Sequence, residues 1–183
     1  MNSYAVFLRG VNVGGITIKM AALKDALKQR PFGSVKTLLA SGNVVLTSDL
    51  PGSGVKAQFE ECLREAFGYD AWVVVLSALR LAELVAACPY PPDDAETHSY
   101  VTLSSDAGVL DELYDAGTAL DGVELTLLGP EAVAWLAPAG GTLDSPFSKL
   151  SSKPKYKSST TTRNLRTLIK VRDAAADLQG GGG

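Results

Sequence analysis

The stretch that decides the fold is residues 35–47, which read VKTLLASGNVVLT. Residues 35–40 and 44–47 are aliphatic or β-branched runs of strand length, separated by Ser41-Gly42-Asn43. Gly and Asn tolerate the left-handed backbone conformation that a tight turn between two strands requires. The stretch therefore predicts a β-hairpin.

The segments on either side of this hairpin each supply a helix and a strand. Before it, residues 4–9 form an apolar run of strand length, and Met20, Leu23 and Leu27 mark one face of a helix. After it, apolar residues recur at helical spacing over residues 55–66, and residues 72–76 form a continuous apolar strand. The order βαββαβ is that of a ferredoxin-like unit, an antiparallel sheet with two helices on one face.

The second half repeats part of this order. The loop Pro91-Pro92-Asp93-Asp94 follows a third helix and marks the expected boundary between two subdomains. Beyond it we expect a βαββ unit: a strand at residues 100–103, a short helix near Leu110, and strands at residues 123–128 and 132–136. C-terminal helices follow, the last over residues 162–178. The predicted class is α+β, with subdomains at 1–90 and 91–179 and a frayed glycine tail at 180–183.

Composition is that of a soluble globular protein. The chain has 183 residues, of which 46% are hydrophobic, and a formal net charge of -3. The first residues lack the basic region of a signal peptide, and no apolar run approaches a membrane span. Cys62 and Cys88 lie on the apolar faces of predicted helices, which is typical of reduced, buried thiols. We therefore expect a cytoplasmic protein with no membrane partner.

Residues 8–15 read LRGVNVGG, so a strand that ends in Arg9 runs into a loop with three glycines and the amide of Asn12. Glycine lets the backbone approach a ligand, and Arg9 and Asn12 place donors beside it, which predicts a pocket for an anionic or polar group. The spacing matches neither the G-x-G-x-x-G of dinucleotide sites nor the G-x-x-x-x-G-K-[ST] of phosphate loops. The sequence indicates no cofactor.

Two C-terminal segments add further donors. Thr160-Thr161-Thr162-Arg163-Asn164 is expected to open the terminal helix, where free N–H groups attract negative charge. A cation such as Arg163 in the first turn of a helix is unfavourable next to the positive end of the helix dipole, unless a bound anion compensates its charge. Two interpretations of this segment therefore remain, a plain N-cap and an anion-binding site. Lys149 follows the Gly140-Gly141 loop and is either an ordinary surface lysine or a partner of the same anion.

The basic residues are concentrated in one region, because residues 145–172 contain eight Lys or Arg and no acid. Such a run is typical of a solvated surface, but it also attracts phosphates or an acidic partner. Nucleic-acid recognition on a ferredoxin-like sheet normally uses aromatic residues on the central strands, and residues 43–47 contain none. Nucleic acid is therefore a disfavoured partner.

Metal and nucleophile chemistry are also disfavoured. Asp93, Asp94, Glu96 and His98 match no recognised metal-ligand spacing, so a hydrophilic loop is the simpler interpretation and we expect no metal. His98 is the single histidine, which argues against a Ser-His-Asp or Cys-His arrangement. Whether the chain catalyses a reaction stays open.

Several of these motifs together resemble the bacterial family called domain of unknown function 1697. The resemblance rests on LRGVNVGG at residues 8–15, Lys19-Met20, Ser41-Gly42-Asn43-Val44-Val45, Ser148-Lys149-Leu150 and Thr162-Arg163-Asn164, in the family's order over nearly the whole chain. It implies an α+β fold of two subdomains, the first ferredoxin-like. It supplies no catalytic residues, because the family's function is not established.

Our first hypothesis is a cleft between the two halves that binds a phosphate-bearing or carboxylate ligand. The alternatives are an interaction module, which docks a protein or a second copy of the chain, and weak nucleic-acid binding through residues 145–172. The residues expected to line the cleft are Arg9, Asn12, Lys19, Asn43, Lys149, Arg163 and Asn164.

Overall fold

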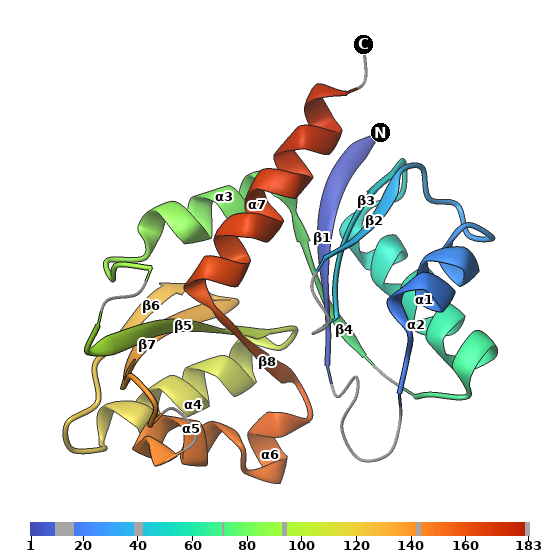
Figure 1. Ribbon diagram of the computed structural model, residues 1–183. Coiled ribbons are helices and arrows are strands. Elements are labelled where there is room, and N and C mark those ends of the chain that lie inside the picture. Colours follow the sequence, from blue (N-terminus) through green and yellow to red (C-terminus); the bar gives the residue numbers. More distant parts are fainter. Residues whose placement is uncertain (10–16, 39–41, 71, 93–94, 142–143, 182–183) are drawn as a thin grey trace. The chain divides into compact units, whose positions relative to one another are not determined.

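A computed structural model of the chain describes residues 1–9, 17–38, 42–70, 72–92, 95–141 and 144–181 (Figure 1). The chain forms two compact units, one of Met1–Ala82 with Lys170–Gly183 and one of Glu83–Ile169. The expected domain boundary near residue 91 stays a prediction, since compactness by itself does not show where an independently folding domain ends.

The first unit has the predicted βαββαβ order. Its four strands form one antiparallel sheet in the order β2-β3-β1-β4, the strand order of a ferredoxin-like unit. Figure 1 shows α1 and α2 covering one face of this sheet. The elements are β1 (Asn2–Leu8), α1 (Met20–Leu27), β2 (Val35–Leu38), β3 (Asn43–Ser48), α2 (Gly52–Phe67) and β4 (Val73–Ser77). The helix that follows, α3 (Ala78–Ala87), begins in this unit and from Glu83 onward belongs to the second unit.

The second unit repeats this plan. Its sheet has the order β6-β7-β5-β8, all antiparallel, so the two sheets have the same arrangement and the predicted α+β class is confirmed. Two short helices, α5 and α6, stand between its third and fourth strands. The elements are β5 (Thr97–Ser104), α4 (Ala107–Thr118), β6 (Leu125–Gly129), β7 (Ala132–Pro138), α5 (Pro146–Ser151), α6 (Pro154–Lys157) and β8 (Thr160–Asn164). The last helix, α7 (Leu165–Gly180), begins in this unit and from Lys170 onward belongs to the first unit.

The hairpin of residues 35–47 is confirmed, because Leu38 pairs with Asn43 and Val35 with Leu46 in an antiparallel register. Gly42 has φ 79°, in the left-handed region where a residue with a Cβ is strained. Its carbonyl oxygen accepts a hydrogen bond from the backbone N–H of Leu8 (2.9 Å). The turn therefore lies beside the end of β1, where the glycine-rich loop begins.

One prediction about the second unit is wrong. Thr160 to Asn164 does not open the terminal helix but forms the edge strand β8, paired with β5 from Tyr100↔Asn164 to Ser104↔Thr160. The reason is that β-branched threonines favour extended backbone wherever a partner strand is available. The terminal helix α7 begins only at Leu165.

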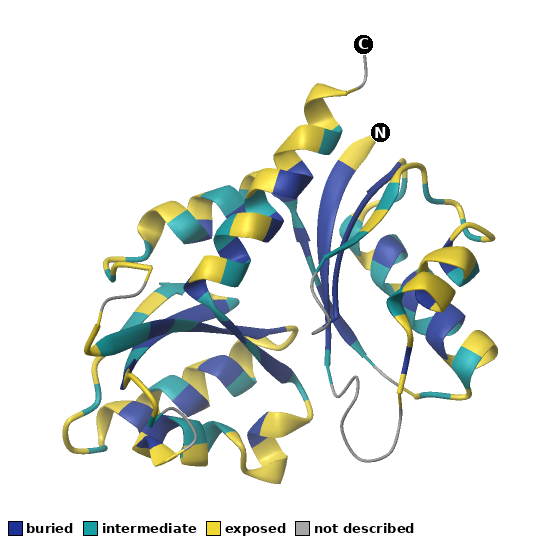
Figure 2. Ribbon diagram, in the orientation of Figure 1, coloured by how far each residue is buried: buried dark blue, intermediate teal, exposed yellow. Residues whose placement is uncertain are grey.

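Both faces of the central strands are buried (Figure 2). In β1, Tyr4, Val6 and Leu8 belong to a core with residues of α1 and α2, and the intervening Ala5 and Phe7 on the other face are also fully buried. In the second unit the core on the helix side is centred on Trp135, which stacks on Tyr100 with ring centroids 4.9 Å apart. None of the described helices has the length and hydropathy that crossing a bilayer requires.

Candidate functional site

Arg9 follows the last residue of β1 and lies against Trp72. The antiparallel register pairs Leu8 with Val73, so Arg9 and Trp72 are the next residues along the two neighbouring strands. The guanidinium carbon of Arg9 lies 5.5 Å from the centroid of the Trp72 ring, within the range of a cation–π interaction. The indole therefore supports the guanidinium at the end of the sheet.

Lys56 and Glu60 of α2 hold the other side of this site. The Nζ of Lys56 lies 5.9 Å from the centroid of the Trp72 ring, donates to the carbonyl oxygen of Val73 (2.6 Å) and pairs with Glu60. Glu60 Oε1 also accepts the backbone N–H of Val73 at 3.2 Å. The charge of Lys56 is thus neutralised by its helix neighbour, and α2 is fastened to the start of β4.

The positive charge of Arg9 has no such partner. Among the residues that the structure describes, Arg9 makes no ion pair with a carboxylate, although it is only half exposed. Partial burial lowers the pKa of Arg9, and burial raises the pKa of Tyr69, whose hydroxyl donates to the Arg9 carbonyl oxygen at 2.6 Å. Arg9 therefore presents a partly desolvated cation on a backbone that Tyr69 fixes.

Asn43 lies at the same end of the first sheet. Asn43 pairs with Phe7, which comes two residues before Arg9. Because side chains alternate between the faces of a sheet, Asn43, Phe7 and Arg9 all lie on the face that is not covered by α1 and α2. Asn43 is fully buried and its Nδ2 donates to the Leu38 carbonyl oxygen at 3.2 Å. Lys19, by contrast, is exposed in the extended residue before α1, and Asn12 lies outside the described residues.

The other three predicted residues belong to the second unit. Arg163 is buried in β8, where burial lowers its pKa to about 10, and it donates to Thr161 Oγ1 (2.6 Å) and the Thr162 carbonyl oxygen (3.0 Å). Asn164 Oδ1 accepts the backbone N–H of Arg166 at 2.8 Å and so caps α7. Lys149 is exposed in the last turn of α5.

The structure thus places Arg9 and Asn43 at the same end of the first sheet, whereas Arg163 and Asn164 are consecutive residues of β8 in the second unit. The convergence of the two groups in one cleft stays a prediction. Sequence reasoning missed Trp72 and Lys56. A usable signal for Trp72 existed, because the ferredoxin-like order pairs β1 with β4 and so places the end of one beside the start of the other.

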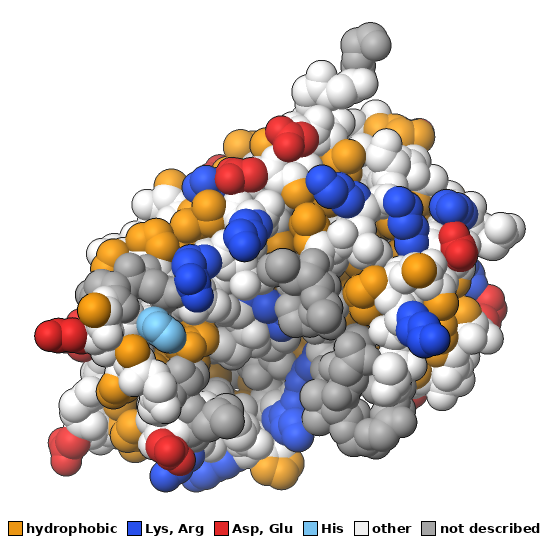
Figure 3. Space-filling view, viewed as in Figure 1, with side chains coloured by type: hydrophobic (Ala, Val, Ile, Leu, Met, Phe, Trp, Pro, Cys, Tyr) orange, Lys and Arg blue, Asp and Glu red, His pale blue; other side chains and the backbone are white. Residues whose placement is uncertain are grey.

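The basic segment 145–172 contributes mostly surface charge, since all its Lys and Arg residues except Arg163 are exposed or half-buried. Some of these charges are paired, as Lys155 with Glu112 and Arg172 with Asp173. Figure 3 shows Lys and Arg side chains at several separate places on the face in view. Among the described residues, no group of three His, Cys, Asp or Glu side chains is placed to hold a metal ion, and Asp93 and Asp94 lie outside those residues.

The family model described as Protein of unknown function (DUF1697) matches residues 1–126, a span that contains β1, β4 and the Arg9–Trp72 contact. The chain belongs to the DUF1697 family. A conserved bacterial protein from Streptococcus pneumoniae, SP0830, has a similar solved structure, with a TM-score of 0.80 at 20% sequence identity over 95% of this chain and 98% of that chain. At that identity the likeness shows a shared fold. No curated protein matches the chain.

Proposed function

We propose that this member of the DUF1697 family is a cytoplasmic protein that binds a small phosphate-bearing or carboxylate ligand, with Arg9 as the principal cation. The observation that carries the proposal is a partly buried guanidinium, supported by Trp72, with no carboxylate partner among the described residues. Taking a cation partly out of water costs free energy, which an anionic ligand would offset. The free thiols Cys62 and Cys88 fit a reducing compartment.

The chemistry of the site suits an oxyanion. A guanidinium offers a planar fork of N–H donors that matches two oxygens of a phosphate or carboxylate, and the Trp72 ring lies 5.5 Å from the central carbon of that fork. Because the charge of Lys56 is neutralised by Glu60, Arg9 is left as the unpaired cation beside Trp72 among the described residues. Of the other predicted donors, Lys19 belongs to the same unit as Arg9 and is exposed just before α1.

A thermal-shift screen tests the proposal. The probes are inorganic phosphate, pyrophosphate, AMP, glucose 6-phosphate and citrate, with adenosine and glucose as neutral counterparts. We expect at least one anion to raise the unfolding temperature of the wild type and of Lys36→Gln, which removes an exposed cation of β2, but not of Arg9→Gln. Equal shifts for Arg9→Gln and the wild type would rule out the assignment of Arg9.

A second function, self-association or protein docking, is favoured by a specific feature of the second sheet. Its edge strand β6 presents Leu127 with 40% of its surface exposed, next to unpaired backbone groups that can accept a further strand. Light scattering on the wild type and Leu127→Lys distinguishes this function. A dimer in the wild type that the substitution abolishes would support it, and a monomer at all concentrations would exclude self-association.

A further inference from the structure

The first unit contains a polar cavity of about 620 Å³ at the start of β1, the end opposite Arg9. Its walls come from the start of β1, the end of β3 and the last residues of α7, far from Arg9 along the strand. Its lining includes Met1, Ser3, Thr47, Asp177, Leu178 and Gln179.

Ser3 provides the first indication of a ligand. The residue is 1% exposed, and its Oγ has no hydrogen-bond partner among the described residues. A buried hydroxyl without a partner is destabilising, whereas alanine at the same position would avoid that cost. A bound molecule with a hydrogen-bonding group in this cavity would supply the missing partner.

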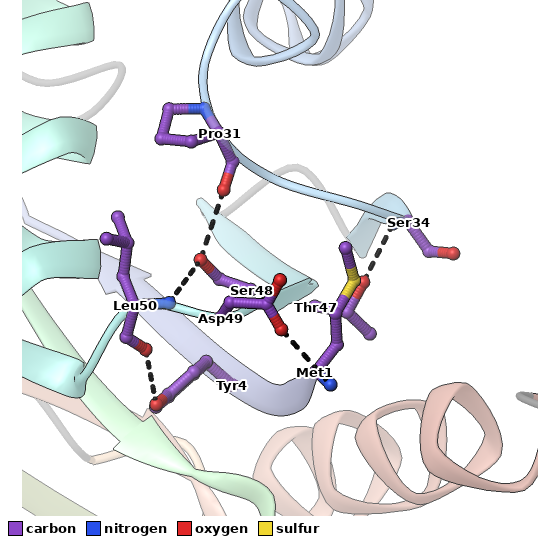
Figure 4. Close-up of polar contacts among 8 residues, drawn as sticks. All are labelled: Met1, Tyr4, Pro31, Ser34, Thr47, Ser48, Asp49 and Leu50. Carbon is purple, nitrogen blue, oxygen red and sulfur yellow. Dashed lines mark hydrogen bonds and ion pairs between the residues drawn. The ribbon is translucent and has the colours of Figure 1, made fainter.

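The wall beside Ser3 is held rigidly (Figure 4). Thr47 lies directly opposite Ser3 in the sheet, and its Oγ1 accepts the backbone N–H of Ser34 at 2.9 Å. The neighbouring Ser48 hydroxyl donates to the Pro31 carbonyl oxygen at 3.1 Å, which fixes the chain that leads to Ser34. A Cβ on Gly33 would come within 2.3 Å of Thr47 Oγ1, so the close contact between these two residues leaves no room for a side chain at position 33. The cavity wall is therefore preformed.

The charges of the lining favour a cation. Asp177 is exposed and makes no ion pair among the described residues, and Gln179 adds an amide oxygen. The α-ammonium group of Met1 is paired with Asp49 at 3.2 Å, as Figure 4 shows. The described lining contains no Lys or Arg side chain, and the positive group that Met1 brings to it is paired with Asp49.

The cavity also has apolar surface, from the side chains of Met1 and Leu178. Carboxylate, hydroxyl and amide oxygens next to apolar side chains match a molecule that carries ammonium groups on a methylene chain. We propose that this cavity binds a small aliphatic polyamine, with an ammonium group at Asp177, an N–H donated to Ser3 Oγ, and methylenes against Met1 and Leu178.

Calorimetric titration of the full chain with spermidine tests this proposal, with hexanediol as a neutral probe. We expect Asp177→Asn to weaken spermidine binding about threefold to tenfold, because the exposed ion pair is screened by solvent. Ser3→Ala should weaken it by about tenfold through the lost hydrogen bond. Asp173→Asn, on the same helix but outside the lining, should leave the affinity unchanged.

Three results would overturn the proposal. The first is the absence of spermidine binding to the wild type at about 1 mM, the range of weak ligands. The second is an equal loss of affinity in Asp173→Asn and Asp177→Asn, which would indicate attraction to the overall acidic charge. The third is hexanediol binding as tightly as spermidine. Arg9→Gln should not change spermidine binding, so this test and the test of the anion site can fail separately.

Discussion

The Arg9 guanidinium and the Trp72 indole lie 5.5 Å apart, at the end of the first sheet where β1 leads into the glycine-rich loop. Arg9 is separated from Trp72 by more than sixty positions in the sequence, and the β1–β4 pairing brings them together. This contact distinguishes Arg9 from a fully exposed arginine, because the guanidinium is partly buried beside the ring and loses part of its hydration.

Replacing Trp72 should therefore affect stability and ligand binding together. We expect Trp72→Ala to lower the free energy of unfolding by about 1–3 kcal/mol, since a half-buried ring and its cation–π contact are lost. Trp72→Phe should retain more than half of that stability, because a smaller aromatic face remains. Urea unfolding measures both, and equal stability of Trp72→Ala and the wild type would show that the contact is not stabilising.

The hydroxyl of Thr102 in the second unit is expected to contribute to the stability of the protein through a buried hydrogen-bond network. It accepts the Trp135 Nε1–H at 3.0 Å and lies 2.8 Å from the Thr162 hydroxyl, so it joins β5, β7 and β8 in a buried network. Thr102→Val keeps the shape but leaves the indole N–H unpaired, which should cost about 1–3 kcal/mol. In a double-mutant cycle, Trp135→Phe should cost less on the Thr102→Val background than in the wild type. Strict additivity would contradict the network.

The sequence predicts the first unit better than the second for a physical reason. The turn at Gly42 and Asn43 carries its own conformational signal, so the hairpin and the βαββαβ order around it can be read locally. Thr160 to Asn164 carries two opposing signals, because threonine both caps helices and favours strands, and only pairing with β5 decides between them.

The candidate site likewise has features that could be predicted from local sequence and features that depend on pairing between distant strands. Arg9 could be predicted because a cation beside a glycine-rich loop is a local pattern. Its contact with Trp72 depends on the pairing of two strands that are distant in sequence, and burial of Arg163 depends on the same kind of pairing in the second sheet. A pattern within a few residues does not contain that information.

For Gly117 in α4, packing predicts the opposite effect of an alanine substitution from the one that helix propensity predicts. Alanine usually stabilises a helix by about 1 kcal/mol relative to glycine, but a Cβ on Gly117 would lie 2.5 Å from Leu125 Cδ1 and 2.9 Å from Phe147 Cε2. We expect Gly117→Ala to destabilise the protein by about 1–3 kcal/mol through overpacking. Gly52→Ala in α2 is the control, since its nearest neighbour is Tyr4 at 3.8 Å and it should be neutral or stabilising. The same sign for both variants would contradict the packing of α4.

Cys62 should make stability depend on pH in alkaline solution. Burial raises the pKa of its thiol above 9.0, although Arg30 opposes this shift. The folded state therefore keeps the proton that the unfolded state loses, so stability is complete below pH 9 and falls as the pH rises past it, by at most about 1.4 kcal/mol per pH unit.

Urea unfolding of the wild type and Cys62→Ala between about pH 7 and pH 10 checks this, because the range spans the usual pKa of a thiol. The wild type should lose more stability than the variant above pH 9. Cys88, whose pKa burial also raises, is present in both proteins and cancels. Parallel curves would mean that Cys62 does not contribute.

The central claim is that Arg9 is the cation of an anion site, and the affinity for pyrophosphate measured by calorimetry tests it most directly. We expect Arg9→Gln to bind pyrophosphate at least about tenfold more weakly than the wild type, as the loss of charge-assisted hydrogen bonds predicts. Lys36→Gln should bind within about twofold of the wild type, because a distant exposed cation adds little. Equal affinities of Arg9→Gln and the wild type would contradict the claim.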